Sequence, residues 1–352
     1  MKNFLIILAI VLSLSSVSCS NYKKDDSDSA KEIKIDLKKK TIGTKKMGLG
    51  YKSRSKSREL EEDKEEAVDF SIAVAAIGMD DEGKITSISI DDVSRMVDSD
   101  IDSEKSKSLN EEYRTKKEAG NEYGMKEYSG IGREWHEQIK SFEDWMMGKK
   151  IEDVLNMEYK EGENGKKIPD DVDLVSSVTI DVGRYLDAIE NASINAEEIK
   201  SASKIGLGIL SEIESSDEDN LKLRGLETSF AAVALDSEGK IVKSLIDVID
   251  KKYLFDDEGE LESDVDEELK SKKSLGDSYG LKEYSGIKRE WYEQIGDFSE
   301  WTRGRTADEI KGIKMAKVKD KSVPRDTDLI SSVTISISNI QKALLKAIEN
   351  SK

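Results

Sequence analysis

Two nearly identical phrases carry the residues with the clearest chemical potential in this chain. Asp171 to Asp181 reads "DVDLVSSVTID", and Asp326 to Ser336 reads "DTDLISSVTIS". Each phrase places an aspartate, a serine and a threonine at the same spacing: Asp173, Ser176 and Thr179 in the first, and Asp328, Ser331 and Thr334 in the second. Carboxylate and hydroxyl groups can bind or bond to a ligand, so these repeated positions are the first to consider as a site.

The other residue types that often do chemistry give no site. His136 is the only histidine, and without a partner for triad or metal work it is expected at the surface. "DSDIDS" from Asp98 lacks the glycine and the glutamate of a calcium loop, because Ser103 and Leu109 stand there. The sequence has no Walker loop, no GxSxG elbow and no metal-binding cysteine–histidine set. We therefore expect no catalytic residues, no metal site and no independent enzyme activity.

The N-terminal residues predict export. Lys2 precedes the apolar run Phe4–Leu14, which is short for a membrane span and typical of a signal peptide over residues 1–18. Cys19, the only cysteine, follows small residues and resembles the lipidated cysteine of a bacterial lipobox. The alternative is ordinary cleavage after Ser18, which leaves a free thiol. The favoured interpretation is an extracytoplasmic protein anchored by lipid to the cell membrane or the outer membrane.

The composition limits the partners of the chain. Its 352 residues carry a formal net charge of −18. An acidic surface repels nucleic acid and anionic headgroups, so we expect no nucleic-acid partner and membrane contact only through the lipid on Cys19. One cysteine allows no internal disulfide, so the hydrophobic core must hold the fold. Residues 19–41 are charged and poor in large apolar residues, which predicts a flexible tether.

The remainder of the chain is internally duplicated. "MGLGYKS" is answered by "IGLGILS", "YGMKEYSGIGREWHEQIKSFEDWMMGK" by "YGLKEYSGIKREWYEQIGDFSEWTRGR", and the first phrase by the second. Repeats of this length are domains rather than solenoid units. We predict two tandem domains, residues 42–195 (the first repeat) and 196–352 (the second repeat), each with a core of its own.

Each repeat is predicted to be α+β, with an antiparallel sheet packed by helices. "TSFAAVAL" and "KIVKSLIDVI" are rich in β-branched and aliphatic residues, and "DSEG" between them is typical of a hairpin turn, as is "DDEG" in the first repeat. From Ser285 an apolar stripe predicts a helix that ends near Gly304, and its counterpart ends near Gly148. Thr306 and Glu309 form a capping box for the next helix. A terminal helix follows each phrase.

The apolar stripes account for all four tryptophans. The stripe residues are Ile131, Trp135, Ile139, Phe142 and Trp145 in the first repeat, and Ile287, Trp291, Ile295, Phe298 and Trp301 in the second. Because helical spacing already explains these tryptophans, we interpret them as core residues rather than as an aromatic ligand pocket.

The phrase "DLISSVTI", which follows a loop and opens a helix, resembles the signature of the FMN-binding domain family. That family includes flavin-carrying extracytoplasmic lipoproteins and the C subunit of the sodium-pumping NADH:quinone reductase. Its motif is an aspartate, two small or apolar residues, Ser or Thr, Gly, Ala, and the Thr or Ser that a secreted flavin transferase joins to the FMN phosphate. The resemblance implies the following roles: aspartates Asp173 and Asp328, first hydroxyls Ser176 and Ser331, and acceptors Thr179 and Thr334. It also implies an FMN-binding-like fold in each repeat, FMN as a covalent cofactor, and a redox partner.

The chain departs from this motif where the family has Gly-Ala. Ser177-Val178 and Ser332-Val333 stand there, and a β-branched valine resists the tight turn that glycine permits. "SSVT" can therefore also be read as a strand-like segment. Three functions stay open: an electron carrier with FMN on either threonine, a non-redox surface binding module that has lost the flavin, and non-covalent binding of a small ligand in the same cleft.

The lipid anchor gives the first testable prediction. The wild-type protein should incorporate a radioactive fatty acid and partition into detergent, and Cys19→Ala should lose both properties while the circular dichroism of the folded part stays unchanged. Fatty-acid labelling that persists in Cys19→Ala would rule out lipidation of this residue.

Overall fold

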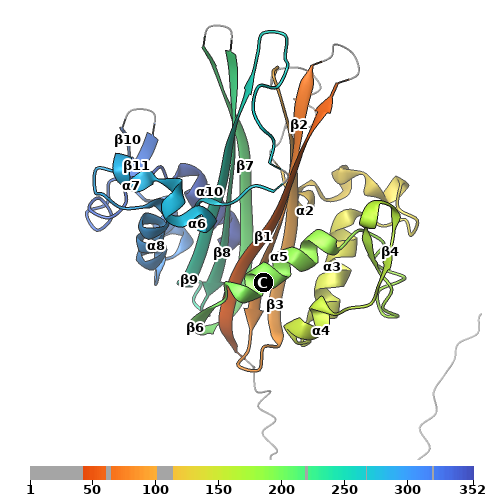
Figure 1. Cartoon of the computed structure of the whole chain (residues 1–352). Coiled ribbons are helices and arrows are strands. Elements are labelled where there is room, and N and C mark those ends of the chain that lie inside the picture. The colour runs from red at the N-terminus through yellow and green to blue at the C-terminus, as the bar shows by residue number, and fades with distance from the viewer. Residues whose placement is uncertain (1–42, 61–64, 101–113, 219–220, 267, 319–320) are drawn as a thin grey trace, which may run out of the picture. The chain divides into compact units, whose positions relative to one another are not determined.

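The computed structural model of the chain describes residues 43–60, 65–100, 114–218, 221–266, 268–318 and 321–352 (Figure 1). The predicted signal peptide, the tether and Cys19 lie outside these residues, so the lipid anchor stays a prediction. The described residues belong to one compact unit, Ile42–Lys352.

Antiparallel sheets form the centre of this unit, as the α+β prediction requires. The larger sheet has the order β3-β2-β1-β6 and consists of β1 (Thr44–Glu59), β2 (Glu66–Met79), β3 (Ile85–Asp98) and β6 (Glu197–Ala202). The second has the order β7-β8-β9 and consists of β7 (Lys204–Glu218), β8 (Leu221–Leu235) and β9 (Ile241–Phe255). Two small ribbons are β4 (Tyr159–Glu161) with β5 (Lys167–Pro169), and β10 (Met315–Val318) with β11 (Lys321–Pro324).

The hairpins predicted at "DDEG" and "DSEG" are confirmed. In the first repeat Asp80 Oδ1 accepts hydrogen bonds from the backbone N–H groups of Glu82 and Lys84, both at 2.9 Å. Asp236 does the same in the second repeat. Gly83 has a φ of 76°, which a residue with a Cβ rarely adopts. Turn chemistry therefore fixes the register of β2 against β3 and of β8 against β9.

Helices follow each sheet in a similar order. In the first repeat they are α2 (Lys116–Ala119), η1 (Gly120–Tyr123), η2 (Met125–Glu127), α3 (Trp135–Met146), α4 (Ile151–Leu155), η3 (Glu163–Gly165) and α5 (Gly183–Ile194). In the second they are α6 (Lys272–Leu275), η4 (Gly276–Tyr279), α7 (Leu281–Tyr284), α8 (Trp291–Thr302), α9 (Ala307–Lys311) and α10 (Ser338–Glu349). The helices expected after the two phrases are α5 and α10.

The striped helices begin later than the apolar spacing predicted. Ile287 lies in a turn before α8, because Lys288 has a positive φ of 55° and Glu290 then caps the helix. Glu134 caps α3 in the same way, so Ile131 also lies outside the helix. Each cap is a box in which the capping glutamate and the glutamate three residues later bond to each other's backbone N–H. Local capping thus overrides the apolar periodicity at this end.

The predicted helix ends and the next capping box are confirmed. α3 ends two residues before Gly148 and α8 two residues before Gly304, with φ of 78° and 76° at the two glycines. Thr306 and Glu309 form the capping box of α9.

The tryptophans differ in burial within each helix. Trp135 and Trp291 are 1% and 3% exposed and belong to the cores between the helices and the sheets, as predicted. Trp145 and Trp301 are only half-buried and stack on Phe142 and Phe298. His136, expected at the surface, is also half-buried.

A third core lies between the two sheets, and it is shared by both repeats. It includes Leu49 and Ile72 from the first sheet and Leu207 and Phe230 from the second. The rings of Tyr51 and Phe230 lie 5.4 Å apart. Figure 1 shows β7–β9 beside β1–β3. The expectation that each repeat contains its whole core is wrong for this layer, because β2 and β8 bury apolar side chains on both faces.

A segment of the second repeat also binds the first sheet. Ser53 Oγ on β1 donates to the carbonyl of Leu269 at 3.0 Å and accepts from its N–H at 2.8 Å. Tyr51 Oη accepts from the N–H of Ser271 at 2.8 Å. The connecting strand β6, which follows the predicted domain boundary at residue 195, pairs with β1 of the first repeat. The two repeats are thus joined by backbone as well as by side chains.

The repeated "GLG" lets the terminal helices lie directly on the sheets. A Cβ on Gly206 would lie 1.8 Å from the carbonyl oxygen of Ala347 in α10, and one on Gly48 would lie 1.9 Å from that of Ala192 in α5. Neither contact can relax by rotating a side chain, because both partners are backbone atoms. These glycines are required for close approach of helix and sheet rather than for an unusual φ.

Gly206→Ala should therefore destabilise the fold by about 1–3 kcal/mol or more, since α10 must move off the sheet. Gly225→Ala is the matched control on β8, because its Cβ would meet no atom closer than 3.8 Å. We expect the control to have the same free energy of unfolding as the wild type or a slightly higher one. Equal free energies of unfolding for the two variants would contradict the packing argument.

Candidate functional site

The two repeated phrases form consecutive turns and not strands. Two backbone N–H groups bond to the carbonyl of Asp171 and two to that of Leu174, and the same pattern recurs at Asp326 and Leu329 in the second repeat. The strand-like interpretation of "SSVT" is therefore wrong for both repeats. The turns place Thr179 and Thr334 each four residues before the first residue of the terminal helix.

Buried apolar residues hold these turns on the protein. Leu174 and Leu329 are both 1% exposed, and the valines Val178 and Val333, which directly precede the threonines, are 0% and 1% exposed. Each valine packs into the core between its helices and sheet. The residue before the threonine is thus an anchor, which fixes the backbone of the threonine itself.

The other predicted site residues do not join the threonines. Asp173, Ser176, Asp328 and Ser331 are exposed on the outer side of the turns. Thr179 lines a pocket, but neither Asp173 nor Ser176 does.

A buried glutamine holds each threonine. Thr179 donates to Oε1 of Gln138 from its backbone N at 2.8 Å and from Oγ1 at 3.2 Å. Thr334 makes the same two bonds to Gln294, at the same distances. Both glutamines are fully buried on α3 and α8. A single amide oxygen therefore determines where each threonine hydroxyl lies.

The remaining amide donors of these glutamines are also satisfied. In each repeat Nε2 donates to a serine hydroxyl and to an arginine carbonyl. These acceptors are Ser129 and Arg133 for Gln138, and Ser285 and Arg289 for Gln294. The sequence interpretation did not include the glutamines, although both copies of the helix contain "EQI" at this place. The feature that could have identified them is that both copies have a glutamine at the same place within an otherwise apolar stripe.

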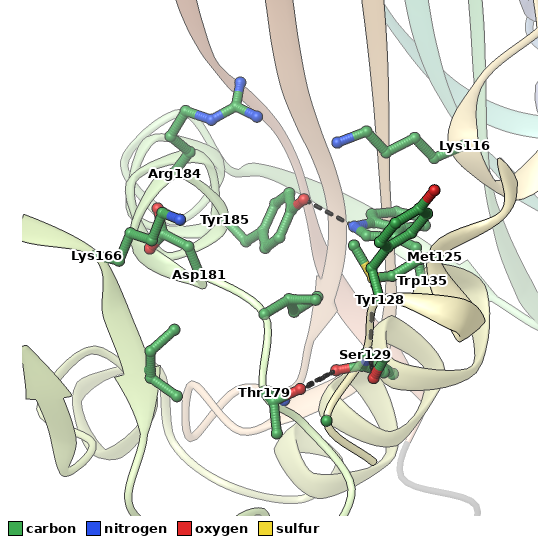
Figure 2. A pocket seen from close by; sticks show the side chains of 14 residues that line it. Lys116, Met125, Tyr128, Ser129, Trp135, Lys166, Thr179, Asp181, Arg184 and Tyr185 are labelled. Carbon is green, nitrogen blue, oxygen red and sulfur yellow. Dashed lines mark hydrogen bonds between the residues drawn. The ribbon is translucent and has the colours of Figure 1, made fainter. Parts of the chain in front are cut away.

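An open pocket of about 510 Å³ lies beside Thr179 in the first repeat. Figure 2 shows Thr179 at one end of the pocket and the side chains of Arg184 and Lys116 at the other. The wall also contains Ser129, Tyr128, Trp135 and Tyr185. Its volume lies within the range of about 300–1,000 Å³ that is usual for small-molecule sites.

A cationic cluster borders the far end of the pocket. The carboxylate of Asp92, 0% exposed, accepts from Arg184 Nη2 at 2.8 Å and lies 3.1 Å from Lys116 Nζ. The Oη of Tyr185 accepts from Trp135 Nε1 at 2.9 Å and lies 3.3 Å from Asp92 Oδ2.

Burial opposes the charged form of Lys116, but the carboxylate of Asp92 outweighs it and holds the pKa of this ammonium above its ordinary value. Burial also raises the pKa of Tyr185, so its hydroxyl stays neutral. Two cations therefore share one buried carboxylate.

A second buried aspartate positions Lys116. Asp91 accepts from Thr115 Oγ1 at 2.6 Å and from the N–H of Lys117 at 3.1 Å, which fixes the first turn of α2. Asp247 accepts from the N–H of Lys273 in the second repeat. Burial raises the pKa of Asp91 to about 6. It does the same to Asp247.

Tyr128 stands at the rim of the pocket and is 89% exposed. Its counterpart Tyr284 is 87% exposed. The chain near Tyr128 is fixed because Glu134 accepts from the N–H groups of Met125 and Lys126 at 2.9 and 3.1 Å. An exposed ring on a fixed turn can stack on a flat ligand without first being ordered.

Comparison with known proteins gives no relative, since no protein-family model, curated protein or solved structure matches this chain. Within the described part of the chain, the helices are all too short or too polar to cross a membrane. Over the same residues, no group of three or more metal-binding side chains comes together.

The aspartates that hold α2 and α6 give a pH-dependent prediction. Asp91 and Asp247 have folded pKa values of about 6, against an ordinary value of 3.8. The folded state thus binds these protons more tightly than the unfolded state does. The stability that they contribute is complete below about pH 4 and is lost as the pH rises through 6.

Wild type should therefore lose stability relative to the double variant Asp91→Asn, Asp247→Asn between pH 4.5 and 7.5. Each unit of pKa difference corresponds to about 1.4 kcal/mol, which predicts a relative loss of about 2–3 kcal/mol for each carboxyl. Denaturant unfolding across this pH range measures the loss. A wild type that gains stability relative to the variant as the pH rises would contradict it.

Proposed function

We propose that the first repeat carries FMN on Thr179 and that the protein is a lipid-anchored, extracytoplasmic electron carrier. The observation that supports this proposal best is that Thr179 lies in the wall of an open pocket that aromatic and cationic side chains also line. The resemblance of the surrounding phrase to the FMN-binding signature independently selects the same hydroxyl. The proposal includes an FMN-binding-like fold in both repeats and a lipid on Cys19.

The attachment is a phosphoryl transfer to a hydroxyl. Thr179 Oγ1 forms a bond to the phosphorus of the flavin nucleotide in a flavin pyrophosphate donor. The bond from that phosphorus to the bridging oxygen breaks, and the leaving nucleotide keeps the electron pair. The hydroxyl proton is lost to a base of the flavin transferase. This chain supplies the fixed hydroxyl, and the transferase supplies the catalysis.

The chain's own residues favour a flat ring attached at Thr179. Gln138 holds Oγ1 of Thr179 at 3.2 Å with a bond that the hydroxyl can give up on esterification. Tyr128 offers an exposed ring for stacking at the rim. Bound FMN would supply the redox chemistry, while the pocket residues would orient it and limit its contact with water.

The second candidate is a non-redox binding module that keeps the fold without flavin. This candidate is favoured by Val178 and Val333, which are buried. They stand where the FMN-binding motif has the alanine of a deformable Gly-Ala turn, and a β-branched residue is stiffer there. A transferase would have to displace this anchor to reach the threonine. The two candidates differ in whether a transferase can modify the protein.

Co-expression with a flavin transferase should give a yellow protein whose intact mass rises by one FMN less one water. The colour should survive denaturation because the link is covalent. Thr179→Ala should remove both colour and added mass, whereas Thr334→Ala, the matched change in the second repeat, should leave them unchanged.

The control for transferase access is the variant Ser177→Gly, Val178→Ala, which restores the family's turn. A coloured restored variant beside a colourless wild type would favour the non-redox binding module. A colourless pair, with the transferase shown to be active on another substrate, would exclude covalent flavin at this site.

A further inference from the structure

The far end of the first-repeat pocket has an equivalent place in the second repeat. Lys116 and Lys272 each begin the short helix after a capping hydroxyl residue, in α2 and α6. Arg184 and Asn339 are each the second residue of the terminal helix, in α5 and α10. Their partners also correspond, because Arg184 donates to Ser71 on β2 and Asn339 donates to Glu227 on β8.

The two places have opposite charge. In the first repeat the cations Lys116 and Arg184 share the single carboxylate of Asp92. In the second, the cation Lys272 lies between two carboxylates, 3.5 Å from Glu227 and 3.0 Å from Asp250. The first cluster has one positive charge in excess and the second has one negative charge in excess.

Four substitutions between the repeats produce this inversion. Asp92 on β3 corresponds to Val248 on β9, since each follows the aspartate that holds the short helix. Arg184 becomes Asn339 and Ser71 becomes Glu227, while Ser94, which lies opposite Ser71, becomes Asp250, which lies opposite Glu227. The two clusters therefore differ in which side chains they contain, although they lie at equivalent positions of the two repeats.

The residues beside the clusters follow the same pattern. Arg54 on β1 lies directly opposite Ser71 across the strand pair. At the equivalent place in the second sheet, Glu212 on β7 lies opposite Glu227. Directly opposed residues have Cβ atoms about 4.5–5.5 Å apart, so Arg54 adds an exposed cation beside the first cluster. Glu212 places a carboxylate beside the second cluster, and Lys342 pairs with it at 3.1 Å and offsets its charge.

The titration of the two lysines agrees with this assignment. The pKa of Lys116 is raised by Asp92 and lowered by the neighbouring guanidinium of Arg184. The pKa of Lys272 is raised by both Asp250 and Glu227, with burial acting against it. Both lysines are cationic at neutral pH, so the difference in sign lies in their partners.

We infer that Lys116 and Arg184 form a subsite for an anionic group of the ligand. We also infer that the excess negative charge at the equivalent place prevents the second repeat from binding the same ligand. Side chains of Arg184 and Lys116 keep 26% and 13% of their surface exposed. Both lie at the same end of the pocket in Figure 2. Arg184 uses one donor of Nη1 and one of Nη2 internally and has others for an oxyanion. This inference rests on the proposed function in placing a flavin nucleotide in this pocket, and it concerns the reversible complex that forms without a covalent bond. FMN joined to Thr179 would hold its phosphate at the opposite end of the pocket, away from this subsite.

The test is reversible binding of two probes, FMN and riboflavin, to protein that has met no transferase. The two share the ring, and only FMN carries the phosphate. Wild type should bind one equivalent of FMN, about tenfold more tightly than riboflavin, in equilibrium dialysis at low salt. Arg184→Asn, which installs the second-repeat residue, should abolish the preference for FMN and leave riboflavin affinity unchanged. Arg184→Lys should keep most of the preference, because it keeps the charge.

Two matched controls separate the subsite from net charge and from folding. Asn339→Ala changes the equivalent position of the second repeat, and Lys140→Gln removes an exposed cation of α3 that pairs with Asp144. Both should bind FMN like the wild type, and all variants should show the wild-type circular dichroism. Equal affinity of wild type for the two probes, two equivalents of FMN, or no binding of FMN would each overturn the inference.

Covalent attachment is scored separately on the same proteins. A yellow protein from the transferase without a reversible preference for FMN would keep the proposed function and remove the anion subsite. A clear preference for FMN in a protein that the transferase cannot modify would support the anion subsite and contradict covalent attachment to Thr179.

Discussion

The fully buried amides of Gln138 and Gln294 are the constraint on which the functional part of the structure depends. A buried amide has to satisfy both its oxygen and its nitrogen, and here the two requirements join three separate segments. The oxygen takes the N–H and hydroxyl of the threonine, and the nitrogen takes a serine and a carbonyl from the turn before the helix. Each threonine is therefore placed by the helix that precedes it in the chain by some forty residues, and not by its own phrase.

That arrangement needs a helix held firmly against a sheet, which the two repeats achieve together. The outer faces of the sheets pack against helices, and the inner faces pack against each other. If the repeats were separated, the apolar inner faces, including Ile72 and Phe230, would lie in water. The segment around Leu269, which bonds to Ser53 on β1, would lose its partner as well. The duplication has thus produced one interdependent unit.

A shared framework leaves each repeat free to change at its own charge cluster. The glutamine–threonine bonds have the same lengths in both repeats, whereas the clusters at the short helices differ in the sign of their net charge. Because the glutamine–threonine bonds are the same in both repeats and the charge clusters are not, packing of the phrase and choice of ligand depend on different residues. Packing of the phrase against the core needs the glutamine in both copies, but the choice of ligand depends on Asp92 and Arg184, which only the first repeat has.

The α+β class, the hairpin turns and the helix ends at Gly148 and Gly304 could be predicted from the sequence alone. These features depend on local chemistry: an aspartate that bonds to the N–H groups of its own turn, or a glycine that accepts a positive φ. The start of α8 at Trp291 was predicted wrongly, because a glutamate cap competes with an apolar stripe and the spacing shows only the stripe.

The shared core of the two sheets could not be predicted from the sequence, and neither could the meeting of Arg184, Lys116 and Asp92 at the end of the pocket opposite Thr179. A strand with apolar side chains on both faces does not say which partner covers each face. Likewise, charges far apart in the chain have no sequence spacing that marks them as neighbours. Their meeting depends on the register of β2 against β3 and on the close approach of α5 to the sheet that the glycines allow.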